Sequence, residues 1–196
     1  MTDEEQAALI VREARDLFVE KGYARTTMED IAAGCGIAKS TLYRHFSNKL
    51  EIFGVIVDDH RQGMLSLPGD YDDLPLEEAI GRIFLVDIDE DAHRKRVEIV
   101  RLVMVEGGQF PELHALLRAR GGDMSRAMLT EWLEAQRRRG RIDIEDSGTT
   151  AKMLMDVLLG AVVMKWEQGP QWPDEIDRGT RLRRIIRIFV NGIRPR

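Results

Sequence analysis

Between Lys39 and Phe46 the chain gathers side chains that donate hydrogen bonds, in a pattern that suits contact with a polyanion. Leu42 and Phe46 are four residues apart, so they are expected to anchor one short helix inward. Ammonium, guanidinium, hydroxyl and imidazole groups on the opposite side of that helix can bind phosphates and base edges. The outward set comprises Lys39, Ser40, Tyr43 and Arg44, with Thr41 and His45 on its flanks.

The residues just before this helix predict the element that positions it. Ile31, Ala32 and Cys35 lie at helical intervals, so they form an inward stripe in which the small Ala32 lets a second helix cross closely. Gly36 tolerates the positive φ that a short turn between crossed helices usually demands, and Ile37 fills the corner. The sequence therefore predicts a helix-turn-helix. The only cysteine, Cys35, is interpreted as a packed thiol that fits a reducing compartment.

The rest of the chain reads as helical, with no sustained alternating strand pattern. A first helix that ends near Gly22 is expected to support the helix-turn-helix, and Ser47 or Asn48 is expected to cap a fourth helix that runs to about Ser66. We predict an all-α fold of about nine helices. Residues 1–47 would form a three-helix DNA-binding domain, and residues 48–196 a helical bundle. Beyond a Pro- and Gly-rich loop, the expected helices are 76–88, 93–106, 110–118, 121–139, 147–167 and 175–192.

Charge is distributed unevenly along the chain. The 196 residues carry a formal net charge of −5, yet the window from Lys21 to Lys49 holds five cations and two carboxylates. A local positive field supports nucleic-acid contact even where the total charge is negative. The sequence shows no secretion signal, and its longest apolar stretch, Val157 to Met164, is far below the roughly 20 residues of a membrane span. We therefore expect a cytoplasmic protein without a membrane partner.

The same stretch resembles the DNA-binding half of the TetR family of transcriptional regulators. The matching elements are Thr26-Thr27, Ile31-Ala32, Gly36-Ile37, the run from Thr41 to Phe46, and Lys49. The resemblance implies that the sugar-phosphate backbone is held by Thr27, Thr41, Tyr43, His45 and Lys49, while Lys39, Ser40 and Arg44 meet base edges. A looser resemblance over the second half implies that it binds a small molecule and supplies a dimer interface.

Two further sets of residues follow from this interpretation. A ligand pocket on the middle helices is expected to use Phe84, Met104, Phe110, Leu113, Leu117, Met124, Met128 and Trp132. The last two helices are apolar over wide arcs, so they either form a purely internal core or pair with a second copy as a four-helix interface. The residues predicted for that interface are Met155, Leu158, Leu159, Val162, Ile185, Ile186 and Phe189.

Metal binding and catalysis are not expected. Asp87, Asp89, Asp91 and Glu98 match acidic positions of a calcium loop, but Ala92 stands where that loop needs glycine. The histidines show no metal-ligand spacing, and no nucleophile is paired with a base in sequence. We predict no cofactor.

The resulting functional prediction is a homodimeric transcriptional repressor that a small-molecule effector of unknown class releases from DNA. Two recognition helices about 34–36 Å apart would read a near-palindromic operator. Two alternatives stay open at this point. One is an activator of the same fold, and the other is an enzyme or metabolite-binding module that has lost DNA binding.

Overall fold

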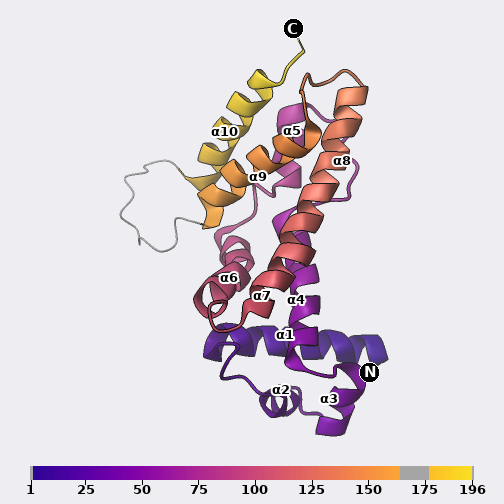
Figure 1. Ribbon diagram of the computed structural model, residues 1–196, viewed down its shortest axis with the longest axis vertical. Helices are drawn as coiled ribbons and strands as arrows, with labels where there is room; N and C mark the ends of the chain where they lie inside the picture. Colours follow the sequence, from indigo (N-terminus) through magenta and orange to yellow (C-terminus); the bar gives the residue numbers. More distant parts are fainter. Residues whose placement is uncertain (1, 164–176, 196) are drawn as a thin grey trace. The chain divides into compact units, whose positions relative to one another are not determined.

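The computed structural model describes residues 2–163 and 177–195, without the side chains of residues 161–163. Over these residues the regular secondary structure is entirely helical, which confirms the predicted all-α class (Figure 1). The helices are α1 (Asp3–Lys21), α2 (Met28–Gly34), α3 (Lys39–His45), α4 (Lys49–Met64), α5 (Leu76–Ile83), α6 (Glu90–Glu106), α7 (Pro111–Leu116), a π-helix (Leu117–Asp123), α8 (Met124–Arg138), α9 (Ser147–Val163) and α10 (Arg178–Gly192).

Several helix boundaries differ from the sequence-based expectation, among them the start of α6, which begins at Glu90 instead of residue 93, and two differences change the connection between helices. The helix expected over 76–88 ends at Ile83, because Leu85 adopts a left-handed conformation with φ 53° and the chain turns there. The gap expected between residues 118 and 121 is instead a π-helix that joins α7 to α8. Both differences arise where backbone geometry departs from the 3.6-residue period on which the expectation rested.

The chain divides into two compact units. The first unit contains residues up to Arg61 together with Glu98–Gly122, and the second contains Gln62–Val97 and Asp123–Arg196. Helices α4 and α6 therefore each contribute residues to both units. The functional boundary expected between residues 47 and 48 stays a prediction.

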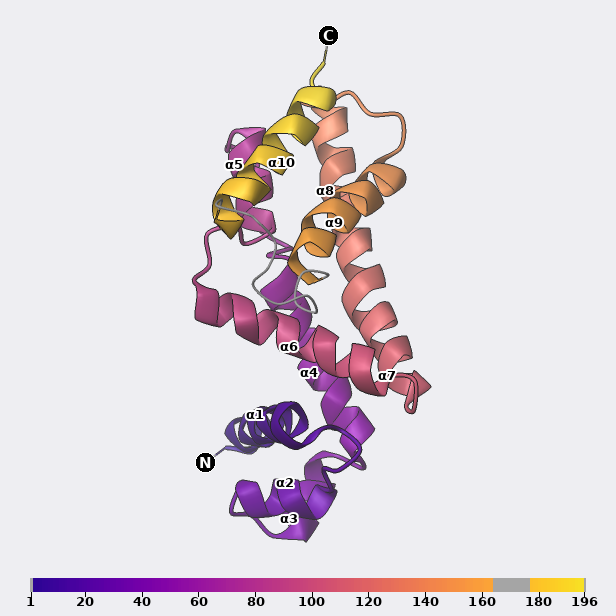
Figure 2. The same ribbon diagram turned by 90° about the vertical axis from the view of Figure 1, so that its left-hand side faces the viewer.

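The core of the first unit is aromatic at its centre. The ring of Phe18 on α1 lies 5.1 Å from that of Tyr23 and 6.2 Å from that of Phe53 on α4, in tilted arrangements that aromatic pairs favour. Ile31 on α2 and Leu42 on α3 are fully buried in the same cluster. Figures 1 and 2 show α2 and α3 side by side along one side of α1. The helix-turn-helix is thus supported by α1, as predicted.

The second unit is a helical bundle. Helix α8 packs along α9, and α10 packs against both α5 and α9 (Figure 2). Ile80 and Ile83 of α5, with Leu129 and Leu133 of α8, are fully buried in its apolar cluster.

Candidate nucleic-acid interface

The turn between α2 and α3 has the geometry that its residues predict. Gly36 has φ +65°, and a Cβ added there would meet nothing within 4 Å, so the requirement for glycine is conformational. The amide of Ile37 donates to the carbonyl oxygen of Ala32 at 3.0 Å and closes the turn. Cys35 is half-buried, and burial raises the pKa of its thiol, which disfavours the reactive thiolate.

Helix α3 presents one polar face outward. Its Lys39, Ser40, Tyr43 and Arg44 are exposed, whereas Thr41 is half-buried. Tyr43 keeps 45% of its surface exposed, so it is not an ordinary core aromatic. The structure therefore brings the six predicted residues of this helix onto one short element, with His45 half-buried at its end.

The cations of α3 already have acidic or amide partners within the first unit. Lys39 forms an ion pair with Glu29 of α2. Arg44 donates from Nη2 to Oε1 of Gln6 at 3.1 Å and lies 3.5 Å from the carboxylate of Asp3. These partners come from α1 and α2, and sequence spacing gave no signal for Gln6 or Asp3.

The same amide of α1 holds His45. Nε2 of His45 lies 2.9 Å from Oε1 of Gln6, which also accepts from Arg44. One glutamine thus orients two of the residues predicted to contact DNA.

The predicted phosphate ligand Thr27 is the N-cap of α2. Its Oγ1 accepts from the amide of Asp30 at 3.1 Å, and the Asp30 carboxylate accepts from the amide of Thr27 at 2.8 Å. This capping box satisfies amides that the helix start leaves unpaired. Thr27 remains exposed, while the neighbouring Thr26 is buried and donates to the carbonyl of Gly22 at 2.8 Å.

The turn between α1 and α2 is held by two charged side chains from elsewhere in the first unit. Glu106, at the end of α6, accepts from the amides of Tyr23 and Ala24 at 2.9 and 2.7 Å. Lys49, at the start of α4, donates to the carbonyl oxygens of Tyr23 and Thr26 at 2.6 and 3.1 Å. The two side chains together form what we call the turn clamp. Its Glu106 was not recognised in the sequence.

Burial and charge within the turn clamp shift two pKa values. Burial, followed by the carboxylates of Glu112 and Glu106, raises the pKa of Tyr23 to about 12. Burial lowers the pKa of Lys49, whose ammonium lies 4.2 Å from the centre of the Tyr23 ring. Lys49, which is predicted to hold a phosphate, therefore donates two of its three N–H groups to backbone carbonyl oxygens of its own chain.

Helix α4 begins at a polar cap next to this face. Oδ1 of Asn48 accepts from the amide of Glu51 at 3.0 Å, so Asn48, one of the two expected caps, fills that role. The Glu51 carboxylate in turn accepts from the amide of Ser47 at 2.7 Å.

The eight residues predicted to bind a ligand fall into different places. Phe84, Met128 and Trp132 belong to the apolar cluster of the second unit. Met104 and Met124 are exposed. Phe110, Leu113 and Leu117 belong to the cluster of the first unit. The structure therefore places three of the eight in each of two separate cores.

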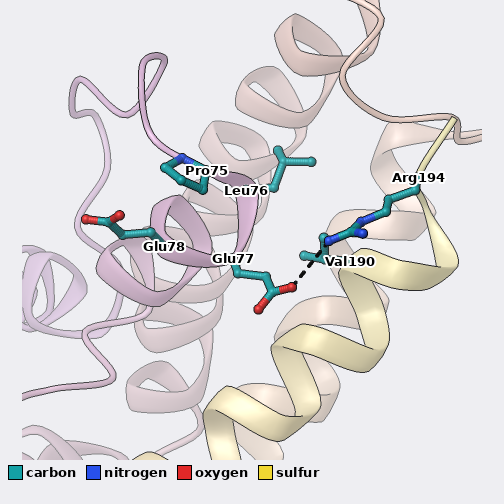
Figure 3. Close-up of a pocket in the computed structure, with 6 residues that line it drawn as sticks. All are labelled: Pro75, Leu76, Glu77, Glu78, Val190 and Arg194. Atoms are coloured by element: carbon teal, nitrogen blue, oxygen red, sulfur yellow. Dashed lines mark ion pairs between the residues drawn. The ribbon is translucent and has the colours of Figure 1, made fainter.

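A shallow pocket of about 300 Å³ opens between the start of α5 and the end of α10 (Figure 3). Glu77 and Arg194 face each other across it with 3.6 Å between their charged atoms. None of the eight predicted ligand residues lines this pocket, whose walls are Pro75, Leu76, Glu77, Glu78, Val190 and Arg194.

The predicted interface residues of α9 and α10 differ in exposure. Leu158 and Ile186 are buried in the chain's own core, so they cannot contact a second copy directly in this conformation. The half-buried members are Met155, Leu159, Ile185 and Phe189, and the side chain of Val162 lies outside the described residues. Three apolar residues of these helices, absent from the predicted set, are exposed: Met153, Val157 and Ile188.

The acidic stretch before α6 is engaged in internal contacts. Asp87 pairs with Arg183, and Asp91 pairs with Arg94. Asp89 accepts from the amide of Ala92 at 2.8 Å and caps the helix. Within the described ranges, no three metal-ligating side chains come together, and no helix is long and apolar enough to cross a bilayer.

These features define a helix-turn-helix protein whose second helix presents hydrogen-bond donors. Residues 10–56 match the bacterial regulatory proteins of the tetR family, and residues 88–192 match the C-terminal domain of AefR-like transcriptional repressors. The chain belongs to the TetR family and is a DNA-binding transcriptional regulator.

Individual relatives agree with this assignment. The chain is 26% identical to the HTH-type transcriptional repressor BepR of Brucella suis biovar 1, over 94% of this chain and 90% of that protein. Over 64 residues, 33% of this chain, it is 36% identical to the HTH-type transcriptional activator FasR of Mycolicibacterium smegmatis, of which the match covers 29%. Among solved structures, the flavonoid-responsive regulator FrrA shares the fold with a TM-score of 0.70 at 24% identity, covering 98% of this chain and 99% of FrrA.

Proposed function

We propose that this regulator is a homodimeric repressor that a small-molecule effector releases from its operator, and that it acts in the cytoplasm. The observation that carries the proposal is the exposed donor face of α3, where Lys39, Ser40, Tyr43 and Arg44 share one side of a helix. In a helix-turn-helix this second helix enters the major groove, where arginine and lysine pair with guanine and hydroxyls meet phosphates. BepR, which is similar over most of the chain, is named a repressor.

Contacts from outside α3 complete the proposed interface. Thr27 and Lys49 are proposed to reach the sugar-phosphate backbone beside Thr41, Tyr43 and His45. Thr27 is exposed at the start of α2, and Lys49 retains one N–H beyond the two that the turn clamp uses. Lys49 would therefore link the fixed turn to a phosphate.

The second copy is proposed to cover the exposed apolar residues of α9 and α10. Ile188 has 73% of its surface exposed, and Met153 and Val157 lie four residues apart on one side of α9. Exposed apolar side chains on two adjacent helices suit a four-helix interface between copies, with the half-buried members of the predicted set at its edges.

The effector is proposed to bind in the second unit, close to Phe84, Met128 and Trp132. These three share one apolar cluster, as a mostly apolar ligand site requires. FrrA, which has the same fold, is described as flavonoid-responsive, a name that supports a small-molecule effector here.

The decisive experiment is fluorescence anisotropy of the protein with a duplex from upstream of its own gene, in excess unrelated DNA. Tight binding that resists the competitor supports the proposal. Tyr43→Phe combined with Arg44→Gln should weaken that binding at least about tenfold, because each replaced side chain removes a polar contact worth about 1–3 kcal/mol. Lys152→Ala is the matched control, since Lys152 pairs with Asp156 on α9 and lies in the second unit. Equal affinity for all duplexes would favour the metabolite-binding module instead.

Whether the protein represses or activates transcription is a separate question, because FasR, similar over a third of the chain, is named an activator. A reporter fused to the bound promoter separates the two. Removing the gene should raise expression if the protein is a repressor and lower it if the protein is an activator.

A further inference from the structure

A buried arginine and a half-buried arginine of the second unit converge on the tight turn between α5 and α6. Arg96 of α6 donates from Nη1 to the carbonyl oxygen of Phe84 at 3.3 Å, and Arg178 of α10 donates from Nη2 to the carbonyl oxygen of Ile88 at 2.5 Å. Only 5% of Arg96 is exposed, and 14% of the Arg178 side chain. The turn itself contains the left-handed residue Leu85. Two guanidinium groups thus meet at one segment.

Part of the hydrogen-bonding capacity of these groups is unused among the described residues. Nε of Arg96, and Nε and Nη1 of Arg178, are buried without a hydrogen-bond partner in the part of the chain that the structure describes. Arginine presents five N–H donors, and buried donors are nearly always paired in proteins. These buried donors therefore need an acceptor that is not among the described residues.

Charge is unbalanced in the same direction. The carboxylate that pairs with Arg178 among the described residues is Glu90, whose Oε1 lies 3.9 Å from Nε and which is 83% exposed. The imidazole of His93 is close enough to feel the charges of both arginines, and its Nδ1 is also buried without a hydrogen-bond partner in the described ranges. Burial, followed by the charges of Arg178 and Arg96, lowers the pKa of His93 to about 4, so His93 is neutral at pH 7. Among the described residues, the buried Arg96 and the half-buried Arg178 therefore have one exposed carboxylate, Glu90, as an ion-pair partner.

Such an arrangement is expected to lower the stability of the fold. Buried charges lose their hydration, and two adjacent cations repel each other. Burial lowers the pKa of Arg96 to about 10, and the neighbouring charge of Arg178 contributes to that shift. Holding the turn would need one hydrogen bond from each side chain, which a neutral amide could supply. The positive charge itself calls for another explanation, and charges kept at a cost are typical of binding sites.

We propose that Arg96 and Arg178 form an anion-binding site that takes the carboxylate of an otherwise apolar small molecule. Guanidinium groups match a planar carboxylate because two parallel N–H groups can meet its two oxygens. The surroundings favour an apolar body, since Phe84, Val86 and Val97 beside the arginines are buried in the apolar cluster. A monoanion is favoured over a phosphate dianion because it loses less hydration on entering such a site. This proposal rests on the proposed function in one respect, namely that the bound acid acts as the effector.

The test is thermal denaturation and isothermal titration calorimetry of the full chain with benzoate, decanoate and formate as probes. Benzamide, which has the shape of benzoate without its charge, is the ligand control. At least one carboxylate should raise the Tm of the wild type while benzamide does not, because a ligand that binds only the folded state stabilises it. Arg96→Met should weaken carboxylate binding by about tenfold or more, since a charge-assisted hydrogen-bonded pair is lost. Protection by none of the three carboxylates, or equal protection by benzamide, would overturn the proposal.

A matched variant separates loss of the site from damage to the helix. Arg94→Met changes an exposed arginine two residues away on α6, where Arg94 pairs with Asp91, and it should bind the carboxylate as the wild type does. The Tm of the ligand-free protein provides a second, independent readout. Arg96→Met should raise that Tm because a buried, uncompensated charge is replaced by an apolar chain that suits the cluster. A lower ligand-free Tm would assign Arg96 a purely structural role and overturn the proposal.

DNA binding distinguishes failure of this site from failure of the proposed function. Arg96→Met should bind the same duplex as the wild type, because the helix-turn-helix belongs to the first unit. Addition of the protecting carboxylate should then release wild-type protein from DNA but not the variant. If the wild type binds no duplex specifically while the carboxylate still protects it, the proposed function fails and the anion site stands.

Discussion

Replacing Glu106 by glutamine tests whether the turn clamp determines the stability of the DNA-reading half. The carboxylate uses both oxygens, Oε1 for the amide of Tyr23 and Oε2 for the amide of Ala24. A glutamine retains one acceptor and places an NH₂ group where the second oxygen was, whichever way the amide is oriented. Glu106→Gln therefore loses one charge-assisted hydrogen bond and sets two donors against each other.

The magnitude follows from the two contacts. A hydrogen bond to a charged group contributes about 1.5–3 kcal/mol, and the lower end applies here because Ala24 is exposed to water. We expect the free energy of unfolding to fall by about 2 kcal/mol. For a chain of 196 residues this corresponds to a decrease in Tm of about 4–8 °C.

The assay is circular dichroism during thermal and urea denaturation, with Glu98→Gln as the control. Glu98 lies on the same helix, and its carboxylate is 3.9 Å from Arg15 in a partly exposed ion pair that should contribute less than about 1 kcal/mol. Glu106→Gln should also weaken DNA binding, because a loosened turn orients α2 and α3 less well. Equal Tm values for the two variants would contradict the proposed role of Glu106. They would mean that water satisfies the two backbone amides without loss of stability.

Three further predictions concern other parts of the chain. Gly36→Ala should lower the free energy of unfolding by about 1 kcal/mol and weaken DNA binding, because φ +65° strains a residue with a side chain even though space is available. An unchanged midpoint in urea denaturation would contradict this prediction. Stability should fall as the pH drops from about 6.5 to about 4 because His93, facing Arg178, Arg96 and Glu90, stays neutral in the fold while the unfolded chain takes up a proton. His93→Gln should flatten that decline, and an equally steep decline in the variant would exclude His93 as its cause. Ile188→Glu should convert the proposed dimer to monomer in sedimentation equilibrium, whereas Val105→Glu, at another exposed apolar site, should not.

Local features of the interface could be predicted from the sequence because they depend on short-range spacing. The positive φ of Gly36 and the exposure of Tyr43 on α3 both follow from residue types at helical intervals. The contacts of Glu106 could not be predicted, because they join positions 82 and 83 residues apart in the sequence. A single glutamate on a helix gives no sequence pattern that points to such distant partners. The same holds for Gln6, which reaches Arg44 and His45 across 38 and 39 positions.

The second unit was harder to predict because apolar periodicity does not separate a pocket from a core. Phe84 and Leu113 have similar chemistry, yet they belong to different apolar clusters. Arg96 and Arg178 lie far apart in the sequence, and nothing in the sequence distinguishes them from ordinary surface arginines before their burial is known. The apolar pattern predicted that the helix of residues 76–88 continues past Leu85, but the left-handed conformation of Leu85 ends it earlier. That conformation depends on tertiary context, so the sequence pattern does not reveal it.

The carboxylates that partner the cations of α3 have a consequence for how the protein would search DNA. Glu29 beside Lys39, and Asp3 beside Arg44, hold these two cations in ion pairs that would have to open before the cations reach base edges. Because these two cations are already neutralised within the protein, DNA binding should release fewer counterions than the number of basic side chains implies. We expect affinity to depend less steeply on ionic strength than in a regulator with unpaired cations. We also expect short residence on unrelated DNA, so that the protein leaves wrong sites quickly and more of its discrimination comes from base edges.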